Sequence, residues 1–321
     1  MARATSPQST ITRPLAPPRS GKRGLGAKIY KQRYLILMAL PGFLLILIFR
    51  YIPMYGLLIS FEDYNYVNGV FGSHWVGLKY YMEFFNNPQA WPLFRNTLLL
   101  GLYSLLWGFP APIILALLMN EIQHTAFKKL VQTVTYLPYF LSAVVIVGMV
   151  ARFSSTDGIF NSVRALFGQS RIPLLSQSRY FRTLFISSGI WQTIGYNCII
   201  YLAALSGVDT TLYDVAELDG ANRWHKMVNI TWPTLKPTTT VLLLLSLGGI
   251  LNTDYQKVLL MYNSSIYDVA DVLGTYIYRL GILGGQFEYT TAVGLLLSII
   301  SFLLVYLANL FCRKLTESSL W

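Results

Sequence analysis

Charged residues are scarce in this sequence of 321 residues. Asp, Glu, Lys and Arg together make up 12% of the chain, whereas soluble globular domains carry about 25%. Hydrophobic residues reach 54%, and the mean hydropathy is +0.47. So little charge argues against a soluble enzyme of this length. The composition instead predicts a protein that crosses the membrane several times.

Metal ligands and catalytic groups are scarce as well. The two cysteines, Cys198 and Cys312, lie in apolar stretches, and the three histidines are scattered. Neither a disulfide framework nor a metal site is therefore expected. The sequence also lacks the Gly-x-x-x-x-Gly-Lys-Ser/Thr loop that binds nucleotide phosphates. We expect no catalytic residue, no metal and no cofactor bound by this chain.

Long runs without charge indicate where the chain crosses the membrane. A helix needs about 20 apolar residues to do so, and the runs lack the alternation typical of strands. Arg50 interrupts the first run, and the fifth has only 17 residues. The six runs are residues 34–60, 96–120, 130–151, 183–208, 237–253 and 289–312. The predicted fold is an all-α membrane protein with six transmembrane helices.

The charges gather at the chain ends and in the loops. Residues 1–33 contain eight Lys or Arg and no acid, which predicts a disordered tail on the cytoplasmic side. Six spans return the C-terminus to that side, so the expected divisions are this tail, a transmembrane domain at 34–312 and a second tail at 313–321. We attribute the net charge of +11 to cytoplasmic loops and tails that lie beside anionic lipid, and not to binding of nucleic acid.

The loop between the fourth and fifth spans, residues 209–236, combines helix signals with apolar residues. Asp209 and Thr210 are typical helix-start residues, Gly220 interrupts the pattern, and Pro233 is expected to end a second short helix. The expected structure is a pair of short helices on the cytoplasmic face. Periodicity alone leaves two roles open, which are docking on a partner and lying on lipid headgroups.

The spacing in this loop resembles the coupling loop of bacterial ATP-binding-cassette (ABC) importer permeases. That loop reads Glu-Ala-Ala, three residues, Gly, nine residues, Ile, one residue, Leu-Pro. The matching positions in this chain are Asp214, Val215, Ala216, Gly220, Ile230, Trp232 and Pro233. Asp214, Val215 and Trp232 depart from the family residues, although Asp214 keeps the negative charge of the usual glutamate.

Other segments extend the resemblance over roughly residues 30–315. Residues 49–56, 157–161, 190–191 and 275–281 are similar to permeases that import complex polysaccharides, such as alginate or rhamnogalacturonan oligosaccharides. The larger permease of the maltose importer is a more distant relative. The resemblance implies the type I importer permease fold in the bacterial inner membrane.

The resemblance also implies several partners. These are a second homologous permease, two ATPase subunits that hold ATP and Mg²⁺, and an external binding protein that delivers an oligosaccharide. The ATPase would dock on residues 212–237. Asp214 would pair with a basic residue there, and Gly220 would permit a sharp turn.

Polar and aromatic side chains in the fourth span are candidates for lining a sugar passage. They are Trp191, Gln192, Thr193, Tyr196 and Asn197, with Asn252 and Asp254 as weaker candidates after the fifth span. Positions in this span resemble cavity-lining positions of the maltose relative. Hydrogen bonding between helices is the alternative role for such residues.

The loop at residues 152–182 is basic although the topology places it outside. It contains five arginines, of which Arg164, Arg171, Arg179 and Arg182 are the candidates for an external basic patch. They would attract an acidic oligosaccharide or the binding protein, or form only a solvated loop face. The weaker alternative function is an ion-driven secondary sugar transporter, because the spans hold almost none of the carboxylates that such a protein needs.

Overall fold

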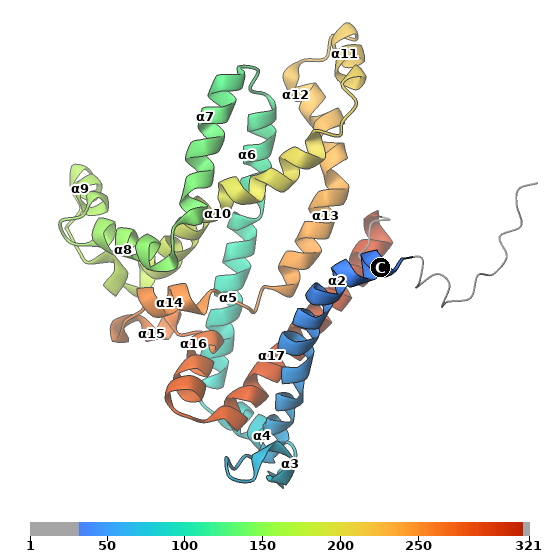
Figure 1. Cartoon of the computed structure of the whole chain (residues 1–321). Coiled ribbons are helices and arrows are strands. Elements are labelled where there is room, and N and C mark those ends of the chain that lie inside the picture. The colour runs from blue at the N-terminus through green and yellow to red at the C-terminus, as the bar shows by residue number, and fades with distance from the viewer. Residues whose placement is uncertain (1–31, 317–321) are drawn as a thin grey trace, which may run out of the picture. The chain divides into compact units, whose positions relative to one another are not determined.

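A computed structural model describes residues 32–316, and this part of the chain is almost entirely helical (Figure 1). The exception is an antiparallel pair of two-residue strands, β1 (Glu62–Asp63) and β2 (His74–Trp75). The predicted tail at 1–33 lies almost wholly outside the described residues, as do residues 317–321 of the second tail. The chain divides into two units, Met1–Gly56 and Leu57–Trp321.

The described part of the first unit is a continuous helical stretch. α2 (Arg33–Ile46) passes through a π-helical turn, η1 (Leu47–Tyr51), into the 3₁₀ helix η2 (Ile52–Phe61), which extends into the second unit. The stretch Arg33–Phe61 is long and apolar enough to cross a membrane, as the sequence predicted.

The second unit contains the remaining helices. In chain order they are α3 (Gly69–Gly72), α4 (Lys79–Asn86), α5 (Ala90–Gly108), α6 (Pro110–Asn120), α7 (Thr125–Tyr136), η3 (Leu137–Phe140), α8 (Ala143–Ser154), α9 (Ile159–Leu166), η4 (Leu174–Ser176), α10 (Ser178–Leu205), α11 (Thr211–Leu218), α12 (Arg223–Lys226), η5 (Met227–Thr231), α13 (Trp232–Gly248), α14 (Tyr255–Met261), η6 (Ser264–Ile266), α15 (Tyr267–Ala270), α16 (Leu273–Ile277), η7 (Tyr278–Leu283) and α17 (Phe287–Thr316). α11 and α12 lie at one end of this unit, and α3 and α4 lie at the other (Figure 1).

α10 is the central helix of the second unit and packs against α5, α6, α7 and α13. One buried cluster joins Cys198 and Tyr201 of α10 to α6 and α13. Another joins Phe181 and Phe185 of α10 to α5, α8 and α14. A third cluster joins α4, α5, α16 and α17. Because α10 contributes to two of the three clusters, residues along it are held firmly.

The predicted third span is wrong as a single helix. Pro138 lies in the first turn of η3, and the chain is extended at Leu141 and Ser142 before α8 begins. The Ser142 side chain accepts a hydrogen bond from the backbone N–H of Val145 and so starts α8 as a new helix. Residues 130–151 are therefore divided between α7 and α8.

The fifth predicted span is displaced along the chain. α13 begins at Trp232, contains Pro237 and ends at Gly248, so residues 249–253 lie beyond the helix. Among the described residues, four helical stretches are long and apolar enough to cross a membrane: Arg33–Phe61, Ala90–Asn120, Ala143–Leu166 and Phe287–Leu310. α10 and α13 are not among these four stretches.

Candidate functional site

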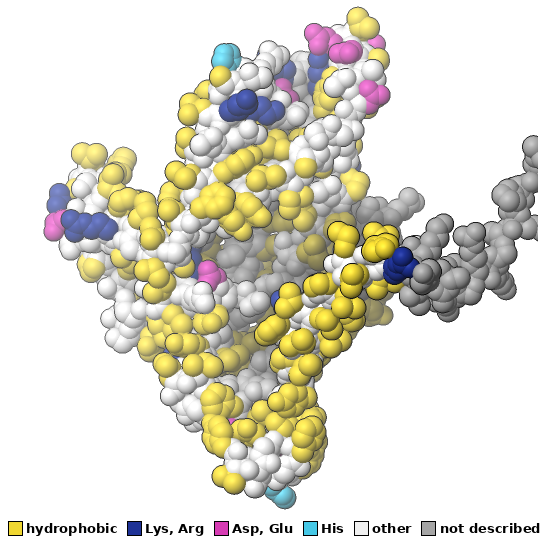
Figure 2. Space-filling model, viewed as in Figure 1, with side chains coloured by type: hydrophobic (Ala, Val, Ile, Leu, Met, Phe, Trp, Pro, Cys, Tyr) yellow, Lys and Arg dark blue, Asp and Glu magenta, His cyan; other side chains and the backbone are white. Residues whose placement is uncertain are grey.

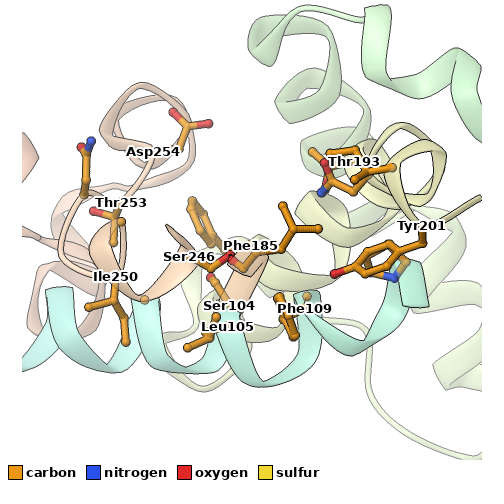
Figure 3. Close-up of a pocket in the computed structure, with 18 residues that line it drawn as sticks. Ser104, Leu105, Phe109, Phe185, Thr193, Tyr201, Ser246, Ile250, Thr253 and Asp254 are labelled. Atoms are coloured by element: carbon orange, nitrogen blue, oxygen red, sulfur yellow. The ribbon is translucent and has the colours of Figure 1, made fainter. Parts of the chain in front are cut away.

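A cavity of about 420 Å³ opens between α5, α6, α10, α13 and residues 249–254. Figure 3 shows Thr253 and Asp254 on one side of it and Thr193 and Tyr201 on the other. The Thr253 hydroxyl is buried and has no hydrogen-bond partner among residues 32–316. The cavity thus offers hydroxyl, amide and carboxylate groups beside aromatic rings, which is the mixture that a carbohydrate requires.

The predicted passage residues divide between this cavity and its surroundings. Thr193, Asn197, Asn252 and Asp254 line the cavity. Gln192 lines a smaller adjoining cavity of about 230 Å³, together with Thr193 and Asp254. Trp191 and Tyr196 line neither cavity. Helical spacing predicts that these residues lie near one another, but it does not predict which side of α10 faces the cavity.

Gln192 and Tyr196 make contacts with the preceding part of the chain. Gln192 Nε2 donates a hydrogen bond to the backbone oxygen of Leu141 over 3.1 Å, at the break between η3 and α8. The Tyr196 ring stacks on Tyr139 with centroids 3.8 Å apart. Gln192 thus makes a hydrogen bond of the kind that the sequence left open and also borders the smaller cavity, whereas Tyr196 makes a ring contact.

Several residues that line the two cavities were not predicted from the sequence. Ser104 and Ser246 line the cavity from α5 and α13, but single serines inside apolar runs give no distinctive signal. Lys257 lines the smaller cavity and is only 3% exposed. Its position just after a predicted span, three residues beyond Asp254, could have marked it for attention.

The segment expected to couple to a partner forms a sharp elbow. α11 ends at Leu218, and Gly220 turns the chain with a φ of +77°. The Asn222 side chain then accepts a hydrogen bond from the backbone N–H of His225 over 2.9 Å and starts α12. The predicted interruption at Gly220 is therefore confirmed, and glycine suits it because other residues rarely adopt this φ.

Two side-chain contacts fix the elbow. Lys226 Nζ donates to Glu217 Oε2 over 2.7 Å, and this hydrogen bond lowers the pKa of the Glu217 carboxyl. The Tyr213 hydroxyl lies 2.9 Å from Thr231 Oγ1. These contacts join α11 to the helix that follows the turn.

The prediction that Pro233 ends the second helix is wrong. α12 continues through the π-helical turn η5 into α13, so residues 223–248 form a continuous helix. Pro233 stands in the first turn of α13. The wider π-helical turn before Pro233 leaves room for the proline ring and does not need the backbone N–H that proline lacks.

The seven motif positions have different environments. Asp214, Val215, Gly220 and Pro233 are exposed, whereas Ala216, Ile230 and Trp232 are half-buried. Large apolar side chains also lie exposed on this segment, namely Leu212, Val215, Leu218, Trp224 and Val228. Figure 2 shows acidic side chains gathered at the α11 end of the second unit. The elbow thus presents apolar and acidic groups together.

The four arginines have different hydrogen-bond and ion-pair partners, although Arg164 and Arg179 both lie over the ring of Tyr180. Arg171 pairs with Asp157 over 3.5 Å, and Arg164 donates to the Tyr180 hydroxyl over 2.7 Å. Arg179 and Arg182 instead line a separate hollow beside Trp107. None of the four lines the central cavity. The described residues also contain no cluster of His, Cys, Asp and Glu suited to a metal ion.

Comparison with known proteins identifies the chain's family. Residues 108–317 match the family described as "Binding-protein-dependent transport system inner membrane component". The chain belongs to this family. It is thus a multi-pass permease of the inner membrane, and the predicted resemblance is confirmed. The matched region includes most residues of the central cavity, the elbow and α17.

Relatives cover nearly the whole of this permease. It is 40% identical to the polygalacturonan/rhamnogalacturonan transport system permease protein YteP of Bacillus subtilis over 94% of each chain. It is also 40% identical to Protein LplB of the same organism over 92% of this chain and 93% of that one. A solved bacterial ABC transporter involved in import of the acidic polysaccharide alginate contains a chain with a TM-score of 0.83 and 38% identity, covering 92% of this chain and all of that one.

Proposed function

We propose that this permease is the transmembrane subunit of an ATP-driven importer and forms half of the passage for an acidic oligosaccharide. The observation that carries the proposal is the central cavity, in which hydroxyl, amide and carboxylate groups face aromatic rings. Relatives named for polygalacturonan and for the acidic polysaccharide alginate support an acidic substrate. The proposal includes six spans with both termini in the cytoplasm.

The energy would arrive from outside the chain. The sequence has no phosphate-binding loop, so ATP and Mg²⁺ belong to two partner ATPase subunits. The exposed elbow at residues 212–237 is where one of them docks, with Asp214 offering the charge for an ion pair. A second permease completes the passage, and an external binding protein delivers the sugar. A related alginate transporter was solved with a periplasmic protein that holds an alginate pentasaccharide, which supports the last partner.

The test is transport by the assembled complex in liposomes. The chain is co-expressed and purified with its permease and ATPase partners, and the binding protein is added outside. Uptake and ATP hydrolysis are measured with oligogalacturonates, alginate oligosaccharides and neutral maltooligosaccharides of equal length. We expect the acidic sugars to stimulate both activities, and only when ATP is present. Uptake driven by an ion gradient without ATP would instead favour a secondary transporter, and stimulation by no sugar would refute the proposal.

The role of the elbow has its own test. Deleting residues 214–220 should abolish uptake and the co-purification of the ATPase, while the chain still inserts into the membrane. Retained transport by this variant would refute the coupling role without affecting the assignment of the substrate.

A further inference from the structure

Lys257 is a buried cation at the wall of the passage. It lies on α14, and only 3% of its surface is exposed. Lys257 borders the smaller cavity, which shares Ser104, Thr193 and Asp254 with the central one. An ammonium group is costly to bury, so its position beside the cavity requires a reason.

The contacts of Lys257 leave most of its binding capacity unused. Nζ donates one hydrogen bond, over 3.1 Å, to the backbone oxygen of Phe185, and it lies 4.9 Å from the centre of that ring. None of the ion pairs found among residues 32–316 includes Lys257. A lysine ammonium has three donors, so two remain for a ligand.

A purely structural role explains the lysine poorly. The Phe185 oxygen also accepts a hydrogen bond from Ser188 Oγ over 3.0 Å, so it does not depend on Lys257. An unbranched apolar side chain would fill the same space without the cost of burying a charge. The amine is therefore better explained by a ligand that enters the cavity than by the packing of α14.

We propose that Lys257 binds the carboxylate of an acidic sugar residue as it passes through the cavity, and so favours acidic over neutral oligosaccharides. Gln192 and Thr193 border the same hollow and offer neutral groups for the hydroxyls of that sugar. None of the four loop arginines lines either cavity, whereas Lys257 lines the smaller one, so the arginines do not take this role. The inference rests on the proposed function and names the group that sets its substrate class.

Asp254 is the charged neighbour of Lys257 in this hollow. Its carboxylate accepts a hydrogen bond from the backbone N–H of Lys257 over 3.1 Å and caps α14. The negative charge opposes an incoming carboxylate. An asparagine at this position would keep the cap and remove the charge, so Asp254→Asn should increase the preference for acidic sugar.

The test compares two forms of one oligosaccharide, an oligogalacturonate and its methyl ester, which differ in the carboxylate charge. Uptake of each is measured in the reconstituted complex at saturating binding protein. Lys257→Met should lower the ratio of acid to ester uptake about tenfold or more, the range expected for a charge-assisted hydrogen bond. Lys257→Arg should restore most of that ratio. Lys79→Met, at an exposed lysine on α4, is the matched control and should leave it unchanged.

The outcomes separate this inference from the proposed function. If the wild-type complex responds to neither form, the proposed function fails and the inference fails with it. If the wild type prefers the acid and Lys257→Met changes both rates equally, only the assignment of Lys257 is overturned. Should Lys257→Met fail to assemble, Lys257→Gln keeps a hydrogen-bond donor without the charge. It must lower the same ratio for the inference to stand.

Discussion

Replacing Gly220 by alanine should weaken the coupling of ATP hydrolysis to transport, and replacing it by asparagine should weaken coupling much less. Gly220 has a φ of +77°, where a side chain with a Cβ atom costs about 1–2 kcal/mol. A Cβ here would meet nothing within 4 Å, so packing within the chain adds no penalty. Asparagine tolerates this region better because its short polar side chain bonds locally.

A cost of 1–2 kcal/mol changes the population of the elbow about 5–30-fold. The assay is the amount of sugar imported per ATP hydrolysed by the reconstituted complex, together with the ATPase retained during purification. Alanine should lower both quantities, and asparagine should keep them near the wild-type values.

The order of the two variants distinguishes two causes. Backbone strain makes alanine the worse substitution, because it is the residue less tolerant of positive φ. A tight fit of the turn into a partner's cleft would make asparagine worse, because it is larger. Wild-type coupling with alanine would refute the reasoning from φ. Weaker coupling with asparagine than with alanine would show that the partner's cleft, rather than the backbone conformation, limits the residue at this position.

Three further predictions concern the elbow, the helix packing and the arginines. Asp214→Ala should release the ATPase during purification, since truncating a buried interfacial charge pair costs about 2–5 kcal/mol. Asp214→Glu keeps the charge and should retain the ATPase. Equal retention of the ATPase by both variants would exclude the ion pair. A Cβ at Gly195 would clash with the backbone oxygen of Thr135. Gly195→Ala should therefore push α10 away from α7, at a cost of about 1–3 kcal/mol, and lower the unfolding temperature. Gly148→Ala, whose Cβ meets nothing within 4 Å, is the control, and equal melting of the two variants would contradict that packing. Neutralising all four loop arginines should raise the half-saturation for a uronate substrate and not for a neutral one, and unchanged uptake of both would exclude steering by this loop.

Local signals predicted some features of this permease correctly. The interruption at Gly220 follows from a residue type and its neighbours. The first and second apolar runs lie within helical stretches that are long enough to cross a membrane, and the last lies within α17. The spacing around Gly220 also indicated the family. These features depend on the chemistry of a few adjacent residues, which is what a sequence displays directly.

Features that depend on distant contacts were missed or misplaced. The break at Leu141 is partnered by Gln192, which lies fifty-one positions further along the chain. Lys257 lines the same cavity as Phe185 and Thr193, which lie more than sixty positions earlier in the chain, so its cavity position could not be read from its sequence neighbours. Trp191 was grouped with Thr193, although only Thr193 lines a cavity. Which side of a buried helix faces a hollow is set by its neighbours.

The misplaced end at Pro233 bears directly on how the proposed coupling would work. A proline inside a helix removes one backbone hydrogen bond and usually bends the helix. Here the N–H of Trp232 bonds to the oxygen of Met227 in the π turn, so the missing N–H of Pro233 falls where the pattern already shifts. Residues 223–248 therefore continue as one helix of about 39 Å at 1.5 Å per residue.

That continuous helix joins the two candidate sites. Its first turns follow Gly220 in the elbow, and Ser246, near its last turn, lines the central cavity. A helix interrupted at Pro233 would absorb a push from the ATPase in the flexible break. A continuous helix instead moves as a body, so displacement at the elbow shifts the cavity wall formed by α13 against α10. The π turn, by preserving the helix through a proline, is thus the local feature on which the proposed transmission depends.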